Sequence, residues 1–562
     1  MELLHPGVYV QEVPSSVRPI EGVSTSTAAF IGIADKGPVP GNILPTGRIA
    51  QPVLITSLTD YSRQFGGFRA DSFLTYAVRA FFENGGKRLY VVRIYPGPAG
   101  PVASGPSALF PGTAGTSVGG GTGFNVLAVN EGAWGNNIWV QVVPSSDGDT
   151  LHNFKLLVMY GLTQKEAVGN VVEAYDGLTF QTSPSLLPGA SSPGSYARTA
   201  INSRSEYIAI TNDFTVAPAV MANPISLTGG SDSTLPASTD FIGSPAADNT
   251  RTGTGIHALD KVTDVNLIAI PGQGDPLTVN DGMAYCKNQR ALQDCFFIAD
   301  VGSVADGSGT TQVPLARSDT TAPTVVTIAD ARNFATTGFN GTTLDKSAGD
   351  YGAIYFPWIY SPDPIGTGRN PKILLPPSGF MAGIYARIDG SRGVFKAPAG
   401  TEAGLAGVIA PYREISDTEQ DSLNPVMVNA IRTVPNSGLV VWGARTIGSD
   451  ASWRYVPVRR IAIFLRVSIY YGIQWAVFEP NDEPLWAELR LNIRSFMLTQ
   501  FRAGAFQGST PDDAFFVKCD SSTTTQQDID NGVVNILVGF APLKPAEFVV
   551  LKLSQKVNQP TQ

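Results

Sequence analysis

The sequence is poor in the residues that most often carry out chemistry. Its 562 residues include three histidines and three cysteines, and charged residues make up 15% of the chain, against about 25% in an average soluble protein. Cys286, Cys295 and Cys519 lie too far apart for a disulfide framework or for the C-x2-C spacing of a zinc site. A phosphate-binding loop of the G-x-x-x-x-G-K-[ST] type is absent. We therefore expect no metal, no cofactor, and folding in the cytoplasm.

The histidines are too few and too scattered for a hydrolase. His5 lies in the N-terminal tail, and neither His152 nor His257 belongs to a paired ligand motif. Gly115-Thr116-Ser117 resembles the nucleophile motif of subtilisin-type proteases, but it stands in a glycine-rich stretch. Both later histidines also follow it, which reverses the subtilisin order. We interpret this stretch as a linker, and we predict no catalytic residue and no enzyme activity.

Charge and hydropathy exclude two further classes. The net charge of −8 speaks against a nucleic-acid-binding protein, and we interpret Arg454, Arg459 and Arg460 as ion-pairing or partner-binding residues. The longest apolar runs, such as residues 461–465, are far shorter than a membrane span, and residues 1–7 do not resemble a signal peptide. We expect no membrane insertion. The low charge suggests that other subunits cover part of the surface.

Apolar runs predict an α/β organisation at the start of the chain. Strands are predicted at residues 28–33, 52–55 and 89–94. Leu74, Ala77, Val78 and Phe81 have helical spacing, so we expect a helix before the last strand. We place the N-cap of this helix at Asp71 and its end at Gly85-Gly86.

The rest of the chain continues in three parts. After a linker at residues 97–124, strand-like runs at 138–143 and 153–158 predict a β-rich insertion that ends near residue 229. Strands at 265–270 and 295–300, with a crossover helix between them at 278–294, then predict a βαβ unit. In the last third we expect strands at 438–443, 514–518 and 533–538, and a long buried element from 458 to 468.

A helix with two distinct faces is predicted to begin near Pro484. Its apolar face carries Trp486, Leu489, Ile493, Phe496 and Phe501. Arg490 and Arg494 are four residues apart, so they share a different face.

Both ends of the chain resemble edge strands. Val8, Tyr9 and Val10 form an extended segment, and Val549, Leu551 and Leu553 alternate along a second one. Such strands leave backbone groups unpaired unless another strand adds to them. They either complete the chain's own sheet or add to the sheet of a neighbouring subunit.

A series of motifs along the chain carries a family resemblance. In the N-terminal part these motifs are Pro6–Pro14, Gly22–Gly32, and Phe81–Gly86 followed by Tyr90–Arg93. In the C-terminal part they are Pro376–Gly379, Gly383–Arg387, Arg392–Gly400, Val441–Thr446, Trp453–Arg460, Phe478–Asp482, Phe515–Asp520, Asp528–Gly532 and Ala541–Phe548. Together these motifs closely resemble the contractile tail sheath proteins of phages and phage-tail-like particles, and the resemblance covers residues 1–95 and about 350–553. Within 97–230 it is limited to Gly132–Asn136.

The resemblance implies a multidomain α+β or α/β fold. It has a mixed α/β inner core that is conserved in the family, a β-rich outer insertion, and extended terminal strand arms. The expected parts are an N-terminal linker arm at 1–22, an α/β core segment at 23–96, a variable outward-facing insertion at 97–230, a central non-catalytic α/β domain of subtilisin-like fold at 231–440, a tube-facing domain at 441–545, and a C-terminal arm at 546–562.

The resemblance also implies a function and partners. Subunits of this family polymerise as stacked hexameric rings around an inner tube, and contraction drives the tube through a target envelope. The implied partners are further copies of the chain, the inner tube protein, baseplate and terminator or cap proteins, and sibling sheath proteins. On the helix after Pro484, we expect Arg490, Arg494 and Arg502 to contact the tube. An ordinary solvated helix face is the alternative for these arginines, and a hydrolase or a static array protein is the alternative for the chain.

Overall fold

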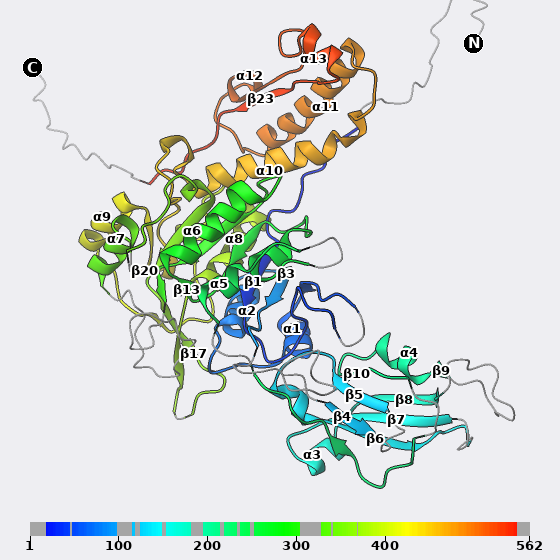
Figure 1. Ribbon diagram of the computed structural model, residues 1–562. Helices are drawn as coiled ribbons and strands as arrows, with labels where there is room; N and C mark the ends of the chain where they lie inside the picture. Colours follow the sequence, from blue (N-terminus) through cyan, green and yellow to red (C-terminus); the bar gives the residue numbers. More distant parts are fainter. Residues whose placement is uncertain are drawn as a thin grey trace, which may run out of the picture. The chain divides into compact units, whose positions relative to one another are not determined.

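The computed structural model describes most of the chain (Figure 1). The described residues are 18–44, 48–97, 115–118, 124–148, 153–180, 195–213, 218–232, 236–247, 252–303, 327–338, 341–367 and 369–547. They form two compact units. The larger unit comprises residues 25–391 and 398–456, and the smaller one includes residues 18–24, 392–397 and 457–547.

An eight-stranded sheet forms the centre of the larger unit. Its strands, in spatial order, are β2 (Val53–Ile55), β3 (Leu89–Arg93), β1 (Ala28–Gly32), β12 (Leu267–Ala269), β14 (Phe296–Asp300), β16 (Gly352–Phe356), β20 (Val428–Val434) and β21 (Gly438–Val441). The six inner strands are parallel, and β2 and β21 are antiparallel edges. Parallel strands that are buried on both faces have continuous apolar sequences instead of alternating ones. The sequence therefore predicted most strands of this sheet.

Helices cover both faces of this sheet. On β14, Phe296 contacts Tyr385 of helix α8 (Ser378–Arg392), whereas the ring of Phe297 lies against Gly282 of helix α6 (Pro276–Ala284). Neighbouring strand residues point to opposite faces, so α8 and α6 lie on opposite sides. The predicted βαβ unit is confirmed, because β12 and β14 are parallel neighbours joined through α6.

Helix α2 (Leu74–Glu83) packs beside α8 through small residues. Gly379 approaches Ala77 so closely that an added Cβ would lie 2.7 Å from the Ala77 Cα. The predicted N-cap at Asp71 is wrong. The Leu74 N–H donates to the Ser72 hydroxyl at 3.1 Å, and the Asp71 carboxylate instead pairs with Arg69 at 2.6 Å.

The insertion contains two further sheets around their own apolar core. One sheet has the order β10 (Ile208–Ile210), β5 (Phe124–Ala128), β4 (Gly115–Val118), and the other has the order β11 (Ile225–Ser226), β6 (Ile138–Pro144), β7 (Asn153–Tyr160), β8 (Val171–Thr179), β9 (Ser195–Tyr196). Alternate residues of β6 are buried, so its side chains face the core in the period of a half-buried strand. The interpretation of Gly115-Thr116-Ser117 as a linker is wrong, because these residues pair with β5.

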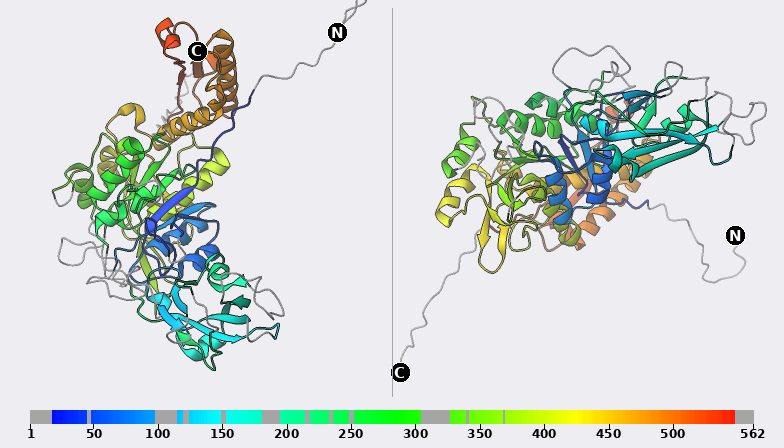
Figure 2. Two further views of the ribbon diagram at one scale, coloured as in Figure 1. Left: turned by 45° about the vertical axis from the view of Figure 1, so that its right-hand side comes forward. Right: turned by 90° about the horizontal axis from the view of Figure 1, so that it is seen from below.

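The remaining elements of the larger unit are short. The helices are α1 (Leu58–Phe65), α3 (Gln164–Val168), α4 (Ala197–Asn202), α5 (Ser238–Ile242), α7 (Ile328–Thr336) and α9 (Asp417–Leu423). The strands are β13 (Gln273–Gly274), β15 (Gly302–Ser303), β17 (Ile359–Pro362), β18 (Lys372–Leu375) and β19 (Ala410–Pro411). Figure 2 shows the larger unit from two further sides.

The smaller unit combines two long helices with a hairpin. Its elements are α10 (Val456–Gly472), α11 (Glu483–Arg502), α12 (Pro511–Ala514), β22 (Phe515–Lys518), α13 (Gln526–Asp530) and β23 (Leu537–Phe540). The buried element predicted at 458–468 is part of α10. The strand predicted at 514–518 is confirmed by β22, but the one at 533–538 is displaced, since pairing with β22 begins only at Leu537.

None of the helices in the described ranges is both long and apolar enough to cross a membrane.

Candidate functional site

Helix α11 carries the residues predicted to contact a tube, and its local sequence explains its position. The Asp482 side chain accepts a hydrogen bond from the Leu485 N–H, and Pro484 occupies the first turn, where proline costs no backbone hydrogen bond. Trp486, Leu489 and Ile493 are buried on one side of the helix, as expected from their spacing, and so is Phe496. The apolar face is therefore confirmed, and it packs inside the smaller unit.

The structure brings the three arginines onto one helix but leaves them in different environments. Arg490 donates one hydrogen bond to the Cys519 carbonyl and another to Glu483 at 3.3 Å. Arg494 pairs with Asp512 at 2.9 Å. Arg502, in the last turn, is exposed and has no ion pair among the described residues. Two of the three candidate tube contacts thus already have partners within the chain.

The terminal segments that we predicted to exchange strands lie outside the described residues. These are Val8, Tyr9 and Val10 at one end and Val549, Leu551 and Leu553 at the other.

The described segment that precedes residue 25 runs along α10. The Val23 N–H donates to the Ser468 hydroxyl at 3.1 Å, Ile20 is buried, and the Arg18 guanidinium lies 4.7 Å from the Trp475 ring. The chain therefore reaches the α10–α11 loop at residue 18.

Within the described ranges, the side chains that were considered for catalysis have other partners. Ser117 donates to Asn125 at 2.7 Å, and His257 contacts Asp260 at 3.2 Å. His5 and His152 lie outside the described residues. Arg459 and Arg460 are buried, so they do not form an exposed basic surface.

The cysteines are buried as well. Burial raises the pKa of the Cys286 and Cys295 thiols, and raises that of Cys519 to about 11, which disfavours reactive thiolates. Among the described residues, no cluster of histidine, cysteine and carboxylate side chains fits a metal ion.

Sequence analysis missed one buried acidic site in the central sheet. Asp300, at the end of β14, accepts hydrogen bonds from the Gly272 N–H at 2.9 Å and from the Ser378 N–H and hydroxyl at 2.8 Å. Burial raises the pKa of Asp300 to about 6, although these hydrogen bonds oppose the shift. The sequence contained one signal that could have found this site: Asp300 directly follows a buried apolar run, at the edge of the sheet where parallel strands end. No histidine takes part, so the arrangement joins β14 to α8 rather than forming a nucleophile.

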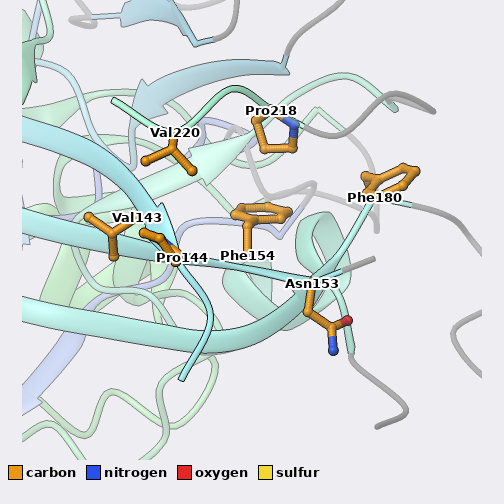
Figure 3. Close-up of a pocket in the computed structure, with 7 residues that line it drawn as sticks. All are labelled: Val143, Pro144, Asn153, Phe154, Phe180, Pro218 and Val220. Atoms are coloured by element: carbon orange, nitrogen blue, oxygen red, sulfur yellow. The ribbon is translucent and has the colours of Figure 1, made fainter. Parts of the chain in front are cut away.

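A small cavity lies in the insertion (Figure 3). Phe154, Phe180 and Pro218 are among the residues that line it, and its volume is about 20 Å³. That volume holds a single water molecule, whereas small-molecule sites measure roughly 300–1,000 Å³. The cavity is therefore no site for an organic ligand.

Comparison with known families identifies the class of protein. The phage tail sheath protein central domain matches residues 252–447, and the phage tail sheath C-terminal domain matches residues 448–556. Together the two models span more than half of the chain. The chain belongs to the phage tail sheath family.

Individual relatives agree with this assignment. A prophage major tail sheath protein of Pseudomonas aeruginosa (strain UCBPP-PA14) is 25% identical over 174 residues, which are 31% of this chain and 44% of that protein. The match thus spans less than half of the relative.

Solved structures share the fold over nearly the whole chain. The sheath complex of an extracellular contractile injection system, PVC, in its contracted state has a TM-score of 0.53 at 21% identity, with 99% of each chain covered. The contracted helical sheath of the anti-feeding prophage has a TM-score of 0.52 at 21% identity, covering 98% and 99% of the two chains. A sheath tail protein of Listeria innocua has a TM-score of 0.55 at 13% identity, covering 93% and 96%.

Proposed function

We propose that this chain polymerises as stacked hexameric rings around an inner tube and contracts to drive that tube through a target cell envelope. The observation that carries the proposal is membership of the sheath family over residues 252–556, together with a fold shared with sheath proteins over almost the whole chain. Baseplate and terminator proteins would complete the particle, sibling sheath proteins are further candidate partners, and assembly would take place in the cytoplasm of the producing cell. The role is mechanical and not enzymatic.

The terminal arms, residues 1–22 and 546–562, would add strands to neighbouring sheets. Main-chain hydrogen bonds between strands do not depend on side-chain contacts, so subunits linked in this way can rotate without separating. Residues 18–24 support the N-terminal half of this proposal, because they lie along α10 of the smaller unit and form no strand of the central sheet.

Electron microscopy of the purified protein at high concentration tests the proposal. Hollow, cross-striated tubes are expected, and deletion of residues 1–22 should leave monomers or small oligomers. A monomer under every condition would contradict self-assembly. Ordered assemblies without a contracted form would instead indicate a static array protein.

Helix α11 would face the tube and the insertion at 97–230 would face outward. Arginines that are four residues apart on one side of the helix supply the motive for the first assignment. Exposed ion pairs contribute only about 0–1 kcal/mol each, but a ring repeats them, and they can release when the sheath widens. Reversal of Arg490 and Arg494 to Glu should abolish co-assembly with the tube while tube-free sheath still forms; unchanged co-assembly would contradict the assignment.

A hydrolase remains the alternative from another class, because the larger unit has a parallel sheet of the kind that enzymes use. Fluorophosphonate labelling separates the two possibilities. Labelling of a serine at native pH, lost on denaturation, would favour the hydrolase.

A further inference from the structure

The loop between α10 and α11 exposes two apolar side chains on a tight turn. The Glu479 N–H donates to the Ala476 carbonyl at 3.2 Å, Val477 is extended with φ −69° and ψ 130°, and Phe478 has a φ of +70°. These values define a type II β-turn, whose third position normally holds glycine or asparagine. A phenylalanine there is strained, yet its side chain is fully exposed at 103%.

Contacts on either side hold the turn in this conformation. Trp475 and Ala476 pack against the cluster around Leu485, Trp486 and Leu489. The Asn481 amide donates to the Val533 carbonyl at 3.1 Å, and its oxygen accepts from the Trp486 indole at 2.8 Å. The structure therefore fixes a strained aromatic residue that gains no packing inside the unit, which is typical of a residue that functions in binding.

The chain segment that carries Phe478 is acidic, although the Arg18 guanidinium lies 4.7 Å from the ring of the nearby Trp475. No lysine or arginine occurs between Arg466 and Arg490, whereas this stretch contains Glu479, Asp482, Glu483 and Glu488. Glu479 directly follows Phe478 and is exposed. A partner that fits the turn would combine an apolar surface with positive charge.

The β22–β23 hairpin presents a surface of that kind. Phe515 and Val517 face the core, so Phe516 and Lys518 point outward, and Leu537 lies directly across from Lys518. Phe516 and Leu537 are 46% and 52% exposed. The Phe516 ring covers Gly539, where an added Cβ would lie 2.3 Å from the ring. The outer hairpin face thus combines apolar side chains with the positive charge of Lys518.

We propose that the Ala476–Glu479 turn of one subunit docks on the outer hairpin face of a second copy of this chain. This inference rests on the proposed self-assembly and names the residues of one contact in it. Phe478 and Val477 would cover Phe516 and Leu537, and Glu479 would pair with Lys518. The two surfaces differ, so the contact is head-to-tail, and such contacts extend into rings or helical polymers instead of closing as a dimer.

Two variants separate binding from folding. Phe478→Gly removes the ring and relieves the strained backbone, so the melting temperature of the subunit should stay the same or rise. The concentration at which polymer first sediments should increase at least ten-fold. Leu162→Ala, at an apolar residue that is 78% exposed in the insertion, is the matched control and should leave this concentration unchanged.

Charge exchange tests the pairing itself. Glu479→Lys should raise the polymerisation threshold several-fold, and so should Lys518→Glu. In the chain with both changes, the polymerisation threshold should return most of the way to the wild-type value, because opposite charges again face each other between subunits. No recovery in the double variant would contradict the contact between Glu479 and Lys518.

Photo-crosslinking identifies the occupant. With benzoylphenylalanine in place of Phe478, irradiated polymers should yield an intermolecular crosslink to the peptides that contain residues 515–518 or 537–540. Crosslinks to another region or to a tube protein would overturn this inference. Unchanged assembly of Phe478→Gly would overturn it too. In both cases the proposed self-assembly would still stand. If the wild-type chain never polymerises, the proposed self-assembly fails first and the contact fails with it.

Discussion

The carboxylate of Asp300 accepts hydrogen bonds from both the backbone N–H and the hydroxyl of Ser378, each at 2.8 Å. Ser378 is the first residue of α8, where unpaired backbone N–H groups favour a negative charge. Because the third bond comes from the Gly272 N–H, one buried side chain links β14, the loop after β12 and a helix that covers the sheet. A contact of this kind stabilises the larger unit.

The pH dependence of stability should show this site. The pKa of Asp300 rises from 3.8 to about 6 on folding, so between these values the folded state binds more protons than the unfolded state. Stability should therefore fall as pH rises from about 4 to about 6, by about 3 kcal/mol in total, and show no further loss from this group above that range.

Urea unfolding at several pH values measures the effect as a difference between variants. In Asp300→Asn, the free energy of unfolding should no longer show this decrease between about pH 4 and about pH 6. Ser378→Ala removes a hydrogen bond that lowers the pKa, so the fall should extend to higher pH. Identical slopes in wild type and Asp300→Asn would show that this carboxyl does not titrate abnormally.

Two ion pairs at different depths should differ strongly in their effect on stability. Arg290 and Asp294 are buried and joined by two hydrogen bonds of 2.7 Å. Asp294→Ala leaves the guanidinium without its counter-charge and should cost about 3–5 kcal/mol. Asp512→Ala, which removes the exposed partner of Arg494, should cost less than about 1 kcal/mol. Equal losses in denaturant melts would contradict this distinction.

The arginines of α11 should differ in how far each also stabilises the subunit. Arg490→Glu places a carboxylate beside the Cys519 carbonyl and Glu483, so the melting temperature should fall by several degrees whether or not a tube is present. Arg502→Glu should leave the melting temperature unchanged and weaken co-sedimentation with the tube several-fold. Normal tube binding by Arg502→Glu would remove that residue from the proposed contact.

The insertion should be removable without loss of the central sheet. The Tyr95 hydroxyl donates to the Ser231 carbonyl at 2.7 Å, so the two ends of the insertion lie side by side. A chain in which residues 98–229 are replaced by a short Gly-Ser linker should fold, with a melting temperature lower by a few degrees, because Arg93 loses one of its four carbonyl partners, Glu131.

Circular dichroism and electron microscopy check this deletion. Polymers of normal helical repeat would agree with an outward-facing insertion. Insoluble protein or failed assembly would show that residues 98–229 support the core or the lattice.

Local periodicity predicted the elements whose burial follows a regular sequence pattern, either on both faces of a strand or on one face of a helix. The parallel strands are buried on both faces, and the spacing of Trp486, Leu489 and Ile493 gave the apolar side of α11. Failures occurred where a neighbour decides the structure. Asp71 is a good N-cap residue by type, but Arg69 competes for its carboxylate. Residues 115–117 stand in a glycine-rich stretch, and they form a strand because β5 pairs with them.

The candidate contact residues show the same limit. The spacing of Arg490 and Arg494 indicated a shared face, but it could not show that Cys519 and Asp512, far along the chain, already bind them. The motif Phe478–Asp482 contributed to the family resemblance without any role for its aromatic residue. The anchors on both sides of the turn depend on residues further along the chain, such as Trp486 and Val533.

The order of strands in the central sheet has a consequence for synthesis on the ribosome. Strand β1 ends at residue 32, but one of its two neighbours, β12, begins at residue 267, and β20 follows only at residue 428. Such long-range pairing slows folding. The insertion, by contrast, has its own core within residues 118–227, so it can fold while the first strands still await their neighbours. During that interval the apolar strands β1 and β3 lack their partners and are prone to aggregate. Rapid translation would shorten the interval, and a bound chaperone would cover the exposed strands.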